Sequence, residues 1–231
     1  MRTIRTLAAV VMAVIIAAPV FAGGKTDDEM KKLRAAELTL KQSVSAPDKG
    51  IPKELLQRAE CIGVFPDVKK AAFVVGGEGG RGVFTCRQKD GTMSAPAFFT
   101  MGGPSIGWQA GIQEADLVLL VMNPEGVNKL LQDHFTIGGE ASAAAGPVGR
   151  TAQAGTDLQL HAQLLTWSRS RGLFAGVSLE GMVIKQNKSA TEDFYGRPID
   201  AKDILVNNTV QVPAAAKSFV NSTTQVARRS S

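Results

Sequence analysis

One short segment of this 231-residue chain has the spacing of a serine nucleophile. Residues 103–107, Gly-Pro-Ser-Ile-Gly, match G-x-S-x-G, in which a sharp turn between a strand and a helix presents the serine. The aspartates and histidines that could complete a triad follow in the required order: Asp116, Asp133 and Asp157, with His134 and His161. However, Pro104 lies directly before Ser105, and the residues after Gly107 indicate strand or turn. A Gly-Pro turn is therefore favoured, and a serine esterase using Ser105 is the remote alternative.

A second glycine-rich segment matches a nucleotide-binding pattern. Residues 77–82, Gly-Glu-Gly-Gly-Arg-Gly, fit G-x-G-x-x-G, which requires a following helix whose N-terminus holds the pyrophosphate. Here residues 83–86, Val-Phe-Thr-Cys, follow and indicate a strand. A glycine-rich hairpin is favoured over nucleotide binding, and the sequence indicates no cofactor.

The cysteines and histidines suit no compact metal site, because Cys61 and Cys86 are far apart in the sequence and so are the two histidines. In an oxidising compartment an even number of cysteines favours a disulfide. Both cysteines lie in strand-like segments, which would permit a cross-strand bond. The equal alternative is two small buried residues. Since no pair of carboxylates stands out for acid–base catalysis either, no enzyme is predicted.

Residues 1–22 have the pattern of a cleavable secretory signal peptide. Arg2 and Arg5 precede the apolar run Leu7–Ala18, and Ala22 offers a small residue for cleavage before Gly23. The run is shorter than the roughly 20 apolar residues that a stable membrane span needs. The mature chain is therefore predicted to be exported, as a periplasmic or secreted protein.

The charge balance argues against nucleic acid as a partner. The formal net charge is +5, and removal of the two leader arginines would lower it by two units. Aromatic residues make up only 6% of the chain, which weakens any case for binding single strands by base stacking. A local basic patch could still favour anionic lipid headgroups.

The order of periodic segments predicts an α+β fold. Residues 27–44 have apolar side chains on one helical face, a turn follows at 46–50, and a short helix begins at Pro52. Strand-like segments then alternate with turn residues, at 61–65, 71–75, 82–87, 97–101, 107–113 and 115–122. The prediction is a mostly antiparallel, barrel-like sheet preceded by an amphipathic N-terminal helix and flanked by short helices.

The second half of the chain continues the same pattern. Asn123-Pro124 is expected to cap a helix that ends near Gln132. Period-two alternation predicts long strands at 157–167 and 172–185, and short helical pieces are expected after Asn187. The polar stretch 221–231 is expected to fray.

Basic residues are predicted to gather at strand ends. Lys69 and Lys70 precede a strand, Arg81 lies in the glycine-rich segment, and Arg169 and Arg171 separate the two long strands. If these loops share one end of the sheet, they form a cationic patch suited to phosphate headgroups. Ordinary solubilising charge is the alternative, and spacing alone favours it.

The chain resembles the SYLF domain family over roughly residues 29–206. Its most specific matching segment is Ser168–Gly181, Ser-Arg-Ser-Arg-Gly-Leu-Phe-Ala-Gly-Val-Ser-Leu-Glu-Gly. The other matching segments are 51–56, 62–71, 79–83, 90–96, 146–150 and 194–196. Met93 stands where many members have tryptophan, and Trp167-Ser168 stands where a Tyr-Ser pair is common.

The resemblance implies a non-enzymatic lipid-binding module. It divides the chain into a signal peptide (1–22), an amphipathic helix with a linker (23–50), a SYLF-like domain (51–206) and a polar tail (207–231). The expected partner is an anionic phospholipid or membrane surface of the cell envelope, and another envelope protein is the alternative. The basic residues expected to contact phosphate are Lys31, Lys32, Lys41, Lys69, Lys70, Arg81, Arg150, Arg169 and Arg171. Docking of the N-terminal helix on the domain is as well supported as its insertion into a membrane.

Overall fold

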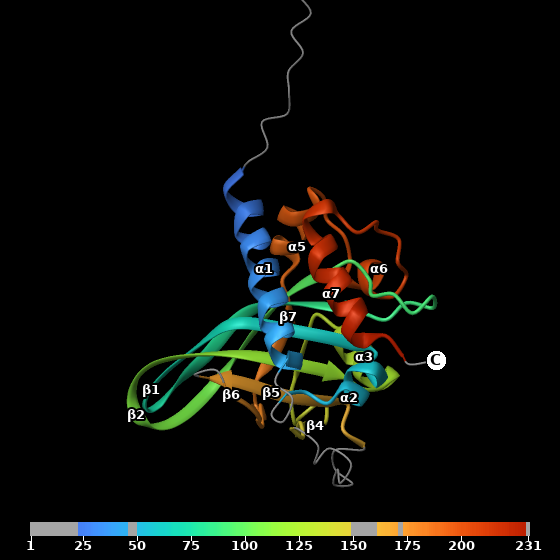
Figure 1. Ribbon diagram of the computed structural model, residues 1–231. Helices are drawn as coiled ribbons and strands as arrows, with labels where there is room; N and C mark the ends of the chain where they lie inside the picture. Colours follow the sequence, from blue (N-terminus) through green and yellow to red (C-terminus); the bar gives the residue numbers. More distant parts are fainter. Residues whose placement is uncertain (1–22, 46–49, 149–160, 171–172, 230–231) are drawn as a thin grey trace, which may run out of the picture.

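The computed structural model describes residues 23–45, 50–148, 161–170 and 173–229, with side-chain detail outside 23–25, 71–75 and 105–112 (Figure 1). The expected signal peptide, its cleavage point at Ala22, Arg150 and Arg171 lie outside these residues, whereas Gly23 begins the described chain. Among the described helices, none has the length and hydropathy required to span a bilayer.

A long two-stranded ribbon forms the centre of the fold. Strands β1 (Cys61–Cys86) and β2 (Ala97–Val121) pair antiparallel from Cys61 opposite Val121 to Phe84 opposite Ala97. The sequence predicted three separate strands in each segment. Instead, both segments form continuous strands with register shifts, one between Phe65 and Val68, just after the predicted strand 61–65, and one between Ala72 and Val74, inside the predicted strand 71–75. Asp67, with φ of 56°, lies in the first of these β-bulges.

The remaining described strands extend the sheet from the edge of β2 that faces away from β1, near the two ends of that strand. They are β3 (His134–Thr136), β4 (Ala143–Ala145), β5 (Leu164–Ser170), β6 (Leu173–Gly176) and β7 (Val183–Gln186). The strand order is β3-β7-β2-β5-β4, with β1 added to β2 and β6 added to β5. Within the described sheet only β4 and β5 pair in parallel. The predicted class is confirmed: α+β, with a mostly antiparallel sheet that curls into a half-barrel (Figure 1).

The ribbon curls back on itself, so that the two ends of β1 meet. Cys61 and Cys86 form a disulfide with an S–S distance of 2.05 Å, which settles the alternative that the sequence left open. Next to it, Gly63 lies against the ring of Phe84, and Gly82 lies against the ring of Phe65. This reciprocal contact requires glycine, since a Cβ on Gly63 would lie 2.3 Å from Phe84 Cε1.

The glycine-rich segment is not a hairpin turn, contrary to the prediction. Gly77 pairs with Pro104, and Gly79 pairs with Gly102, inside the ladder of β1 and β2. Among the described strands, residues 103–115 of β2 pair only with β1, because β7 ends opposite Gly102 and β5 begins opposite Asp116. Pro104, which lacks an N–H group, lies in this stretch, where β1 is its one described partner strand.

Helices cover the sheet, and the helix after Asn123 begins at the cap that the sequence predicted, whereas the cap at Asn187 begins one of the helical pieces expected after that residue. Asn123 Oδ1 accepts a hydrogen bond from Gly126 N, and Asn187 Oδ1 accepts one from Ala190 N. The described helices are α1 (Gly23–Ser45), α2 (Lys53–Arg58), α3 (Pro124–Leu130), α5 (Lys188–Tyr195), α6 (Ala201–Leu205), the short 3-10 helix η2 (Ala214–Ala216) and α7 (Lys217–Ala227). The predicted helices at 27–44 and after Pro52 are therefore confirmed.

Three predictions in the second half of the chain need correction. Of the strand expected at 157–167, residues 157–160 lie outside the described residues, and the described part is strand from Leu164 and continues to Ser170. The strand expected at 172–185 is divided into β6 and β7 by a turn in which Gly181 has a φ of 83°. The stretch expected to fray is helical through Ala227, because α7 buries Phe219 and Val220 against the domain.

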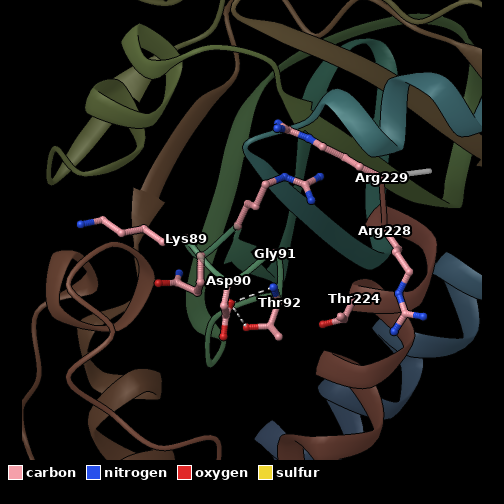
Figure 2. Close-up of a pocket in the computed structure, with 9 residues that line it drawn as sticks. Lys89, Asp90, Gly91, Thr92, Thr224, Arg228 and Arg229 are labelled. Carbon is pink, nitrogen blue, oxygen red and sulfur yellow. Dashed lines mark hydrogen bonds between the residues drawn. The ribbon is translucent and has the colours of Figure 1, made fainter. Parts of the chain in front are cut away.

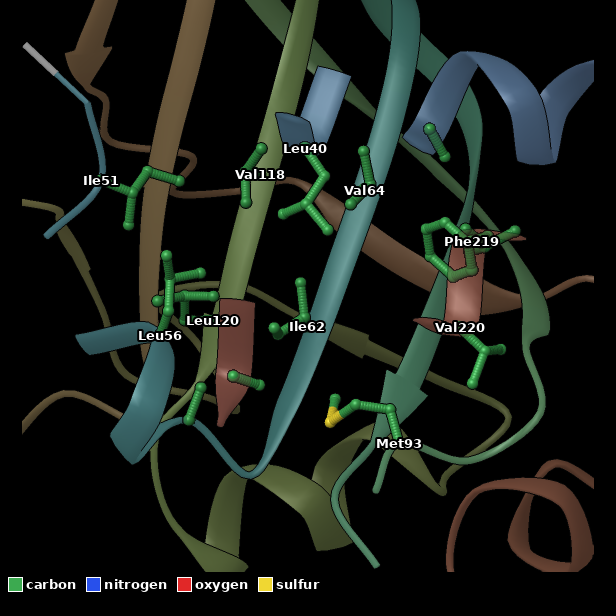
Figure 3. Close-up of a cluster of buried hydrophobic side chains, with 14 of the residues drawn as sticks. Leu40, Ile51, Leu56, Ile62, Val64, Met93, Val118, Leu120, Phe219 and Val220 are labelled. Carbon is green, nitrogen blue, oxygen red and sulfur yellow. The ribbon is translucent and has the colours of Figure 1, made fainter. Parts of the chain in front are cut away.

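Both faces are buried in the parts of the ribbon at residues 61–66 and 117–121, which explains the continuous apolar sequence there. Val118 and Leu120 belong to a cluster under the helices, shown in Figure 3, whereas Leu117 and Leu119 belong to a cluster on the concave side. Helix α1 contacts β1, α5 and α7 and completes the first cluster with Leu40.

Candidate functional site

Helix α1 is docked on the domain, and its apolar face is not available to a membrane. Leu33, Ala36 and Leu40 are buried to 1% exposure or less. Two basic residues of its outer face form ion pairs within the helix, Lys31 with Asp28 and Lys41 with Glu37. Of the two alternatives for this helix, docking is therefore the one observed.

Glu37 links α1 to α7 and carries a pH-dependent part of this contact. Its carboxylate accepts hydrogen bonds from Ser218 Oγ (2.8 Å) and Ser222 Oγ (3.1 Å) in addition to the ion pair with Lys41. Burial would raise the pKa of Glu37, but these hydrogen bonds outweigh it and lower the pKa below its ordinary value. A depressed pKa means that the contact stabilises the fold above about pH 4 and is lost as the pH falls.

We expect the substitution Glu37→Gln to lower the free energy of unfolding by about 1 kcal/mol at pH 7. The difference from the wild type should shrink as the pH is lowered from about 5 to 3, because the wild-type carboxylate then becomes protonated. Urea unfolding at several pH values measures this. The control is Glu54→Gln at an exposed position of α2, and an equal effect of both substitutions at pH 7 would contradict the assignment.

A network of alternating charges joins α1 to the first bulge of β1. Arg81 pairs with Glu29 at 3.0 Å, and Glu29 is 4% exposed. Lys32 Nζ donates a hydrogen bond to Pro66 O (3.3 Å) and lies 3.9 Å from Asp67. Burial lowers the pKa of Lys32, and Asp67 partly compensates for it. Two of the predicted lipid-binding cations therefore hold the helix on the sheet.

The network continues to β5 through a buried carboxylate. Asp116, which is 8% exposed, accepts hydrogen bonds from the backbone N–H of Asp67 (3.1 Å) and from Arg169 Nε (2.9 Å). Arg169 also lies over the ring of Phe174, with Cζ 5.9 Å from the centroid. The guanidinium of Arg169 therefore contacts both a carboxylate and an aromatic ring.

The other predicted cations do not form a common patch with these residues. Lys69 pairs with Glu114 across the ribbon at 3.8 Å. Lys70 is half-buried on β1 opposite Gln113, and Arg150 and Arg171 lie outside the described residues. Among the predicted cations that the structure describes, all except Lys70 have a carboxylate partner.

A different set of basic residues surrounds an open cavity of about 440 Å³ at the end of α7 (Figure 2). One wall is the turn between β1 and β2, and the other is the last turn of α7 with the residues that follow it. The lining residues are Arg87, Gln88, Lys89, Asp90, Gly91, Thr92, Thr224, Arg228 and Arg229. The cavity is therefore lined by four cationic side chains and one carboxylate.

Arg87 anchors the two walls to each other. Its guanidinium donates to Ala59 O (Nε, 3.2 Å), Gln57 O (2.9 Å) and Ala227 O (3.0 Å), and so caps the carboxyl ends of α2 and α7. Burial lowers the pKa of Arg87 and the neighbouring Arg229 lowers it further, although arginine stays charged at neutral pH. Positive charge is thus concentrated behind the cavity.

The cations nearer the opening are less compensated. Lys89 and Arg228 are exposed and make no ion pair within the described part of the chain, whereas Arg229 lies 4.0 Å from Glu60. The lining carboxylate, Asp90, accepts hydrogen bonds from the N–H and the hydroxyl of Thr92, which close the turn. Figure 2 shows this turn facing Thr224 and Arg228, with Lys89 extending on the far side of the turn.

The sequence contained weak signals for this site. Lys-Asp-Gly at 89–91 has the turn residues expected between the strand-like segments 82–87 and 97–101, and the pair Arg228-Arg229 lies in the stretch expected to fray. The two segments are more than a hundred residues apart, and only the packing of α7 beside the turn brings them together. A hydrogen bond from Met93 N to Thr224 Oγ1 (3.1 Å) fixes this arrangement.

The geometry of a hydrolase is not present at Ser105. Its backbone lies within β2, in register with Gly76, and no helix follows it as a nucleophile elbow requires. Its side chain is outside the described detail, and so is most of the segment before His161. The predicted Gly-Pro turn is wrong as well, since Pro104 is part of the same strand.

Comparison with known proteins identifies relatives across most of the chain. Residues 102–226 match the family model Ysc84, described as Las17-binding protein actin regulator. Human SH3 domain-containing YSC84-like protein 1 is 36% identical over 184 residues, which cover 79% of this chain and 53% of the relative. Protein YSC84 of Saccharomyces cerevisiae is 38% identical over 176 residues, covering 75% and 37% of the two chains.

LAS seventeen-binding protein 3 of Saccharomyces cerevisiae is 36% identical over 179 residues, 76% of this chain and 39% of that protein. The matched region thus spans about half or less of the length of these curated relatives. The remaining parts of these relatives have no counterpart in the matched region.

Proposed function

Because this chain belongs to the Ysc84 (SYLF) domain family, we propose that it is an exported, non-enzymatic protein that binds the phosphate groups of anionic phospholipids at a membrane surface of the cell envelope. The observation that carries the proposal is the cavity of Figure 2, where Lys89 and Arg228 have no carboxylate partner within the described residues. Export rests on the pattern of residues 1–22 alone.

The cavity offers the contacts that a phosphate group prefers. Lysine and arginine donate charge-assisted hydrogen bonds to phosphate oxygens, and the hydroxyl of Thr224 can add a neutral one. Near an anionic surface each basic residue contributes about 1 kcal/mol of attraction. Arg87 and Arg229, which also line the cavity, add to its positive potential. Because cations lie on both sides of the turn, the surface can contact several headgroups.

Co-sedimentation with lipid vesicles tests this function. We expect binding to vesicles that contain phosphatidylglycerol and little binding to pure phosphatidylcholine vesicles. The affinity should fall steadily as the salt concentration rises from about 0.05 to 0.5 M, because screening shortens the range of the attraction. Absence of binding to both kinds of vesicle at low salt would refute the proposal.

A second candidate function is binding of another protein of the envelope. It is favoured by the name of one relative, LAS seventeen-binding protein 3, which refers to a protein partner. Recovery of one defined partner by cross-linking in the cell envelope, together with absence of vesicle binding, would favour this candidate over the first.

A further inference from the structure

A second cavity lies on a different side of α7 from the basic one. It has a volume of about 440 Å³ and is bounded by the end of α1, by α2 and by α7. Its lining residues are Lys41, Val44, Ile51, Lys53, Leu56, Ser222, Gln225 and Val226. The volume is within the range of roughly 300–1,000 Å³ that is usual for small-molecule sites.

The inner wall of this groove is apolar and rigid. Leu56 and Ile51 are 1% and 5% exposed and belong to the buried cluster under the helices, at one margin of the group drawn in Figure 3. Val44 and Val226 are half-buried and pack against the same cluster from α1 and α7. A ligand in the groove would therefore contact apolar side chains that the core holds in place.

The rim of the groove is cationic. Lys53 is exposed at the first position of α2 and makes no ion pair within the described residues. Lys41 is 59% exposed and is positioned by Glu37, which Ser218 and Ser222 hold in turn. Two ammonium groups thus border an apolar wall, and the carboxylate near them is already hydrogen-bonded to three donors.

We propose that this groove holds one hydrocarbon chain of an anionic amphiphile, with the anionic head between Lys41 and Lys53. The two ammonium groups at the rim favour a negatively charged head group, and the apolar wall favours a hydrocarbon chain. The inference rests on the proposed function only for the class of ligand, a lipid, and concerns a different site. A fatty acid and a lysophospholipid share this chemistry, and the experiment separates them.

Binding of saturated fatty acids of increasing length, each below its critical micelle concentration, tests the groove. A dansyl-labelled undecanoic acid is bound first as the fluorescent reporter, and each fatty acid is tested for its ability to displace it. We expect the affinity to rise by about fourfold per methylene group until the groove is filled, and then to level off. The alcohols of equal chain length should bind about tenfold more weakly, because they lack the charge. Absence of displacement by both the fatty acids and lysophosphatidic acid, or an affinity independent of chain length, would overturn the inference.

Two variants locate the ligand. Val226→Trp should fill the groove and abolish displacement, and Lys53→Glu should weaken the fatty acid about tenfold while leaving the alcohol unchanged. Lys53 is exposed, so its variant tests the site even if Val226→Trp fails to fold. The control is Lys31→Glu, at an exposed position of α1 away from the groove, which should change the affinity less than twofold.

The experiments test the basic cavity and the apolar groove independently. Substitution of Lys89 and Arg228 by glutamine should leave fatty-acid binding unchanged, since neither residue lines the groove. Vesicle binding without fatty-acid or lysophospholipid binding would overturn only the inference, whereas the reverse would overturn only the proposed function. If lysophosphatidic acid binds and fatty acids do not, the groove still holds one chain and the head is identified as a phosphate.

Discussion

Replacing both Cys61 and Cys86 with alanine is expected to lower the free energy of unfolding by about 3 kcal/mol. The disulfide joins the two ends of β1, which are 25 residues apart in the chain. A cross-link that closes a loop of this size restricts the unfolded chain by about 3–4 kcal/mol. Both half-cystines are also buried, at 0% and 3% exposure, so the double variant loses packed sulfur atoms in addition.

Urea unfolding of the wild type and the double variant measures this effect. The folded wild type should also resist reduction by dithiothreitol until denaturant is added, because the disulfide is not exposed to solvent. A double variant whose unfolding free energy lies within about 1 kcal/mol of the wild-type value would show that the curl of β1 does not depend on this bond.

Gly63→Ala is expected to cost about 2–3 kcal/mol of stability, the second large effect. The new methyl group would lie 2.3–2.8 Å from three ring atoms of Phe84. Phe84 is fully buried and packs edge to face with Phe65 and Phe99, at centroid distances of 5.7 and 4.9 Å. The ring cannot move aside without disturbing this aromatic cluster, and forced overpacking of a core costs about 1–3 kcal/mol.

Gly77 provides the matched control in the same strand, because a Cβ there would have its nearest neighbour 4.0 Å away. Gly77→Ala should change the unfolding free energy by less than about 0.5 kcal/mol. A double-mutant cycle sharpens the test: in the background of Phe84→Leu, the cost of Gly63→Ala should fall by at least about 1 kcal/mol. Equal costs in both backgrounds would contradict the proposed contact.

Local signals predicted the helices and the class of the fold, because capping residues and periodicity act within a few residues. Asn123 and Asn187 begin their helices as expected. The breaks between strands were misjudged for a physical reason. Pro66 and Asp67 are turn formers in isolation, but the pairing of β1 with β2 absorbs them as a bulge. Propensity alone does not distinguish these two outcomes.

The glycines also show that local sequence signals do not identify long-range contacts. Glycine in a strand-like segment marks either a turn or a close approach of another chain segment. Gly63 and Gly82 serve the close approach, but the aromatic partner of each lies about twenty residues away in the same strand. Only the curl of the ribbon brings Phe84 against Gly63, and the sequence does not show this curl.

The candidate site was predictable in chemistry but not in position. A cationic surface for phosphate was expected, and the basic residues named for it included Arg81 and Arg169. Both turn out to neutralise buried carboxylates, Glu29 and Asp116. Whether a cation is paired depends on tertiary contacts over distances of fifty residues or more, whereas the pattern along the chain shows only its presence. Lys89 and Arg228, which have no carboxylate partner among the described residues, lie where α7 meets the turn before β2.

The most direct test of the proposed phosphate-binding site compares two double variants of equal charge in vesicle co-sedimentation. Lys89→Gln with Arg228→Gln removes the two uncompensated cations of the cavity, and Lys31→Gln with Lys69→Gln removes two that are paired with Asp28 and Glu114. At about 1 kcal/mol per cation, the first pair should weaken binding to phosphatidylglycerol vesicles about thirtyfold. The second pair should weaken it less than threefold. Equal losses in the two double variants would contradict a site at this cavity.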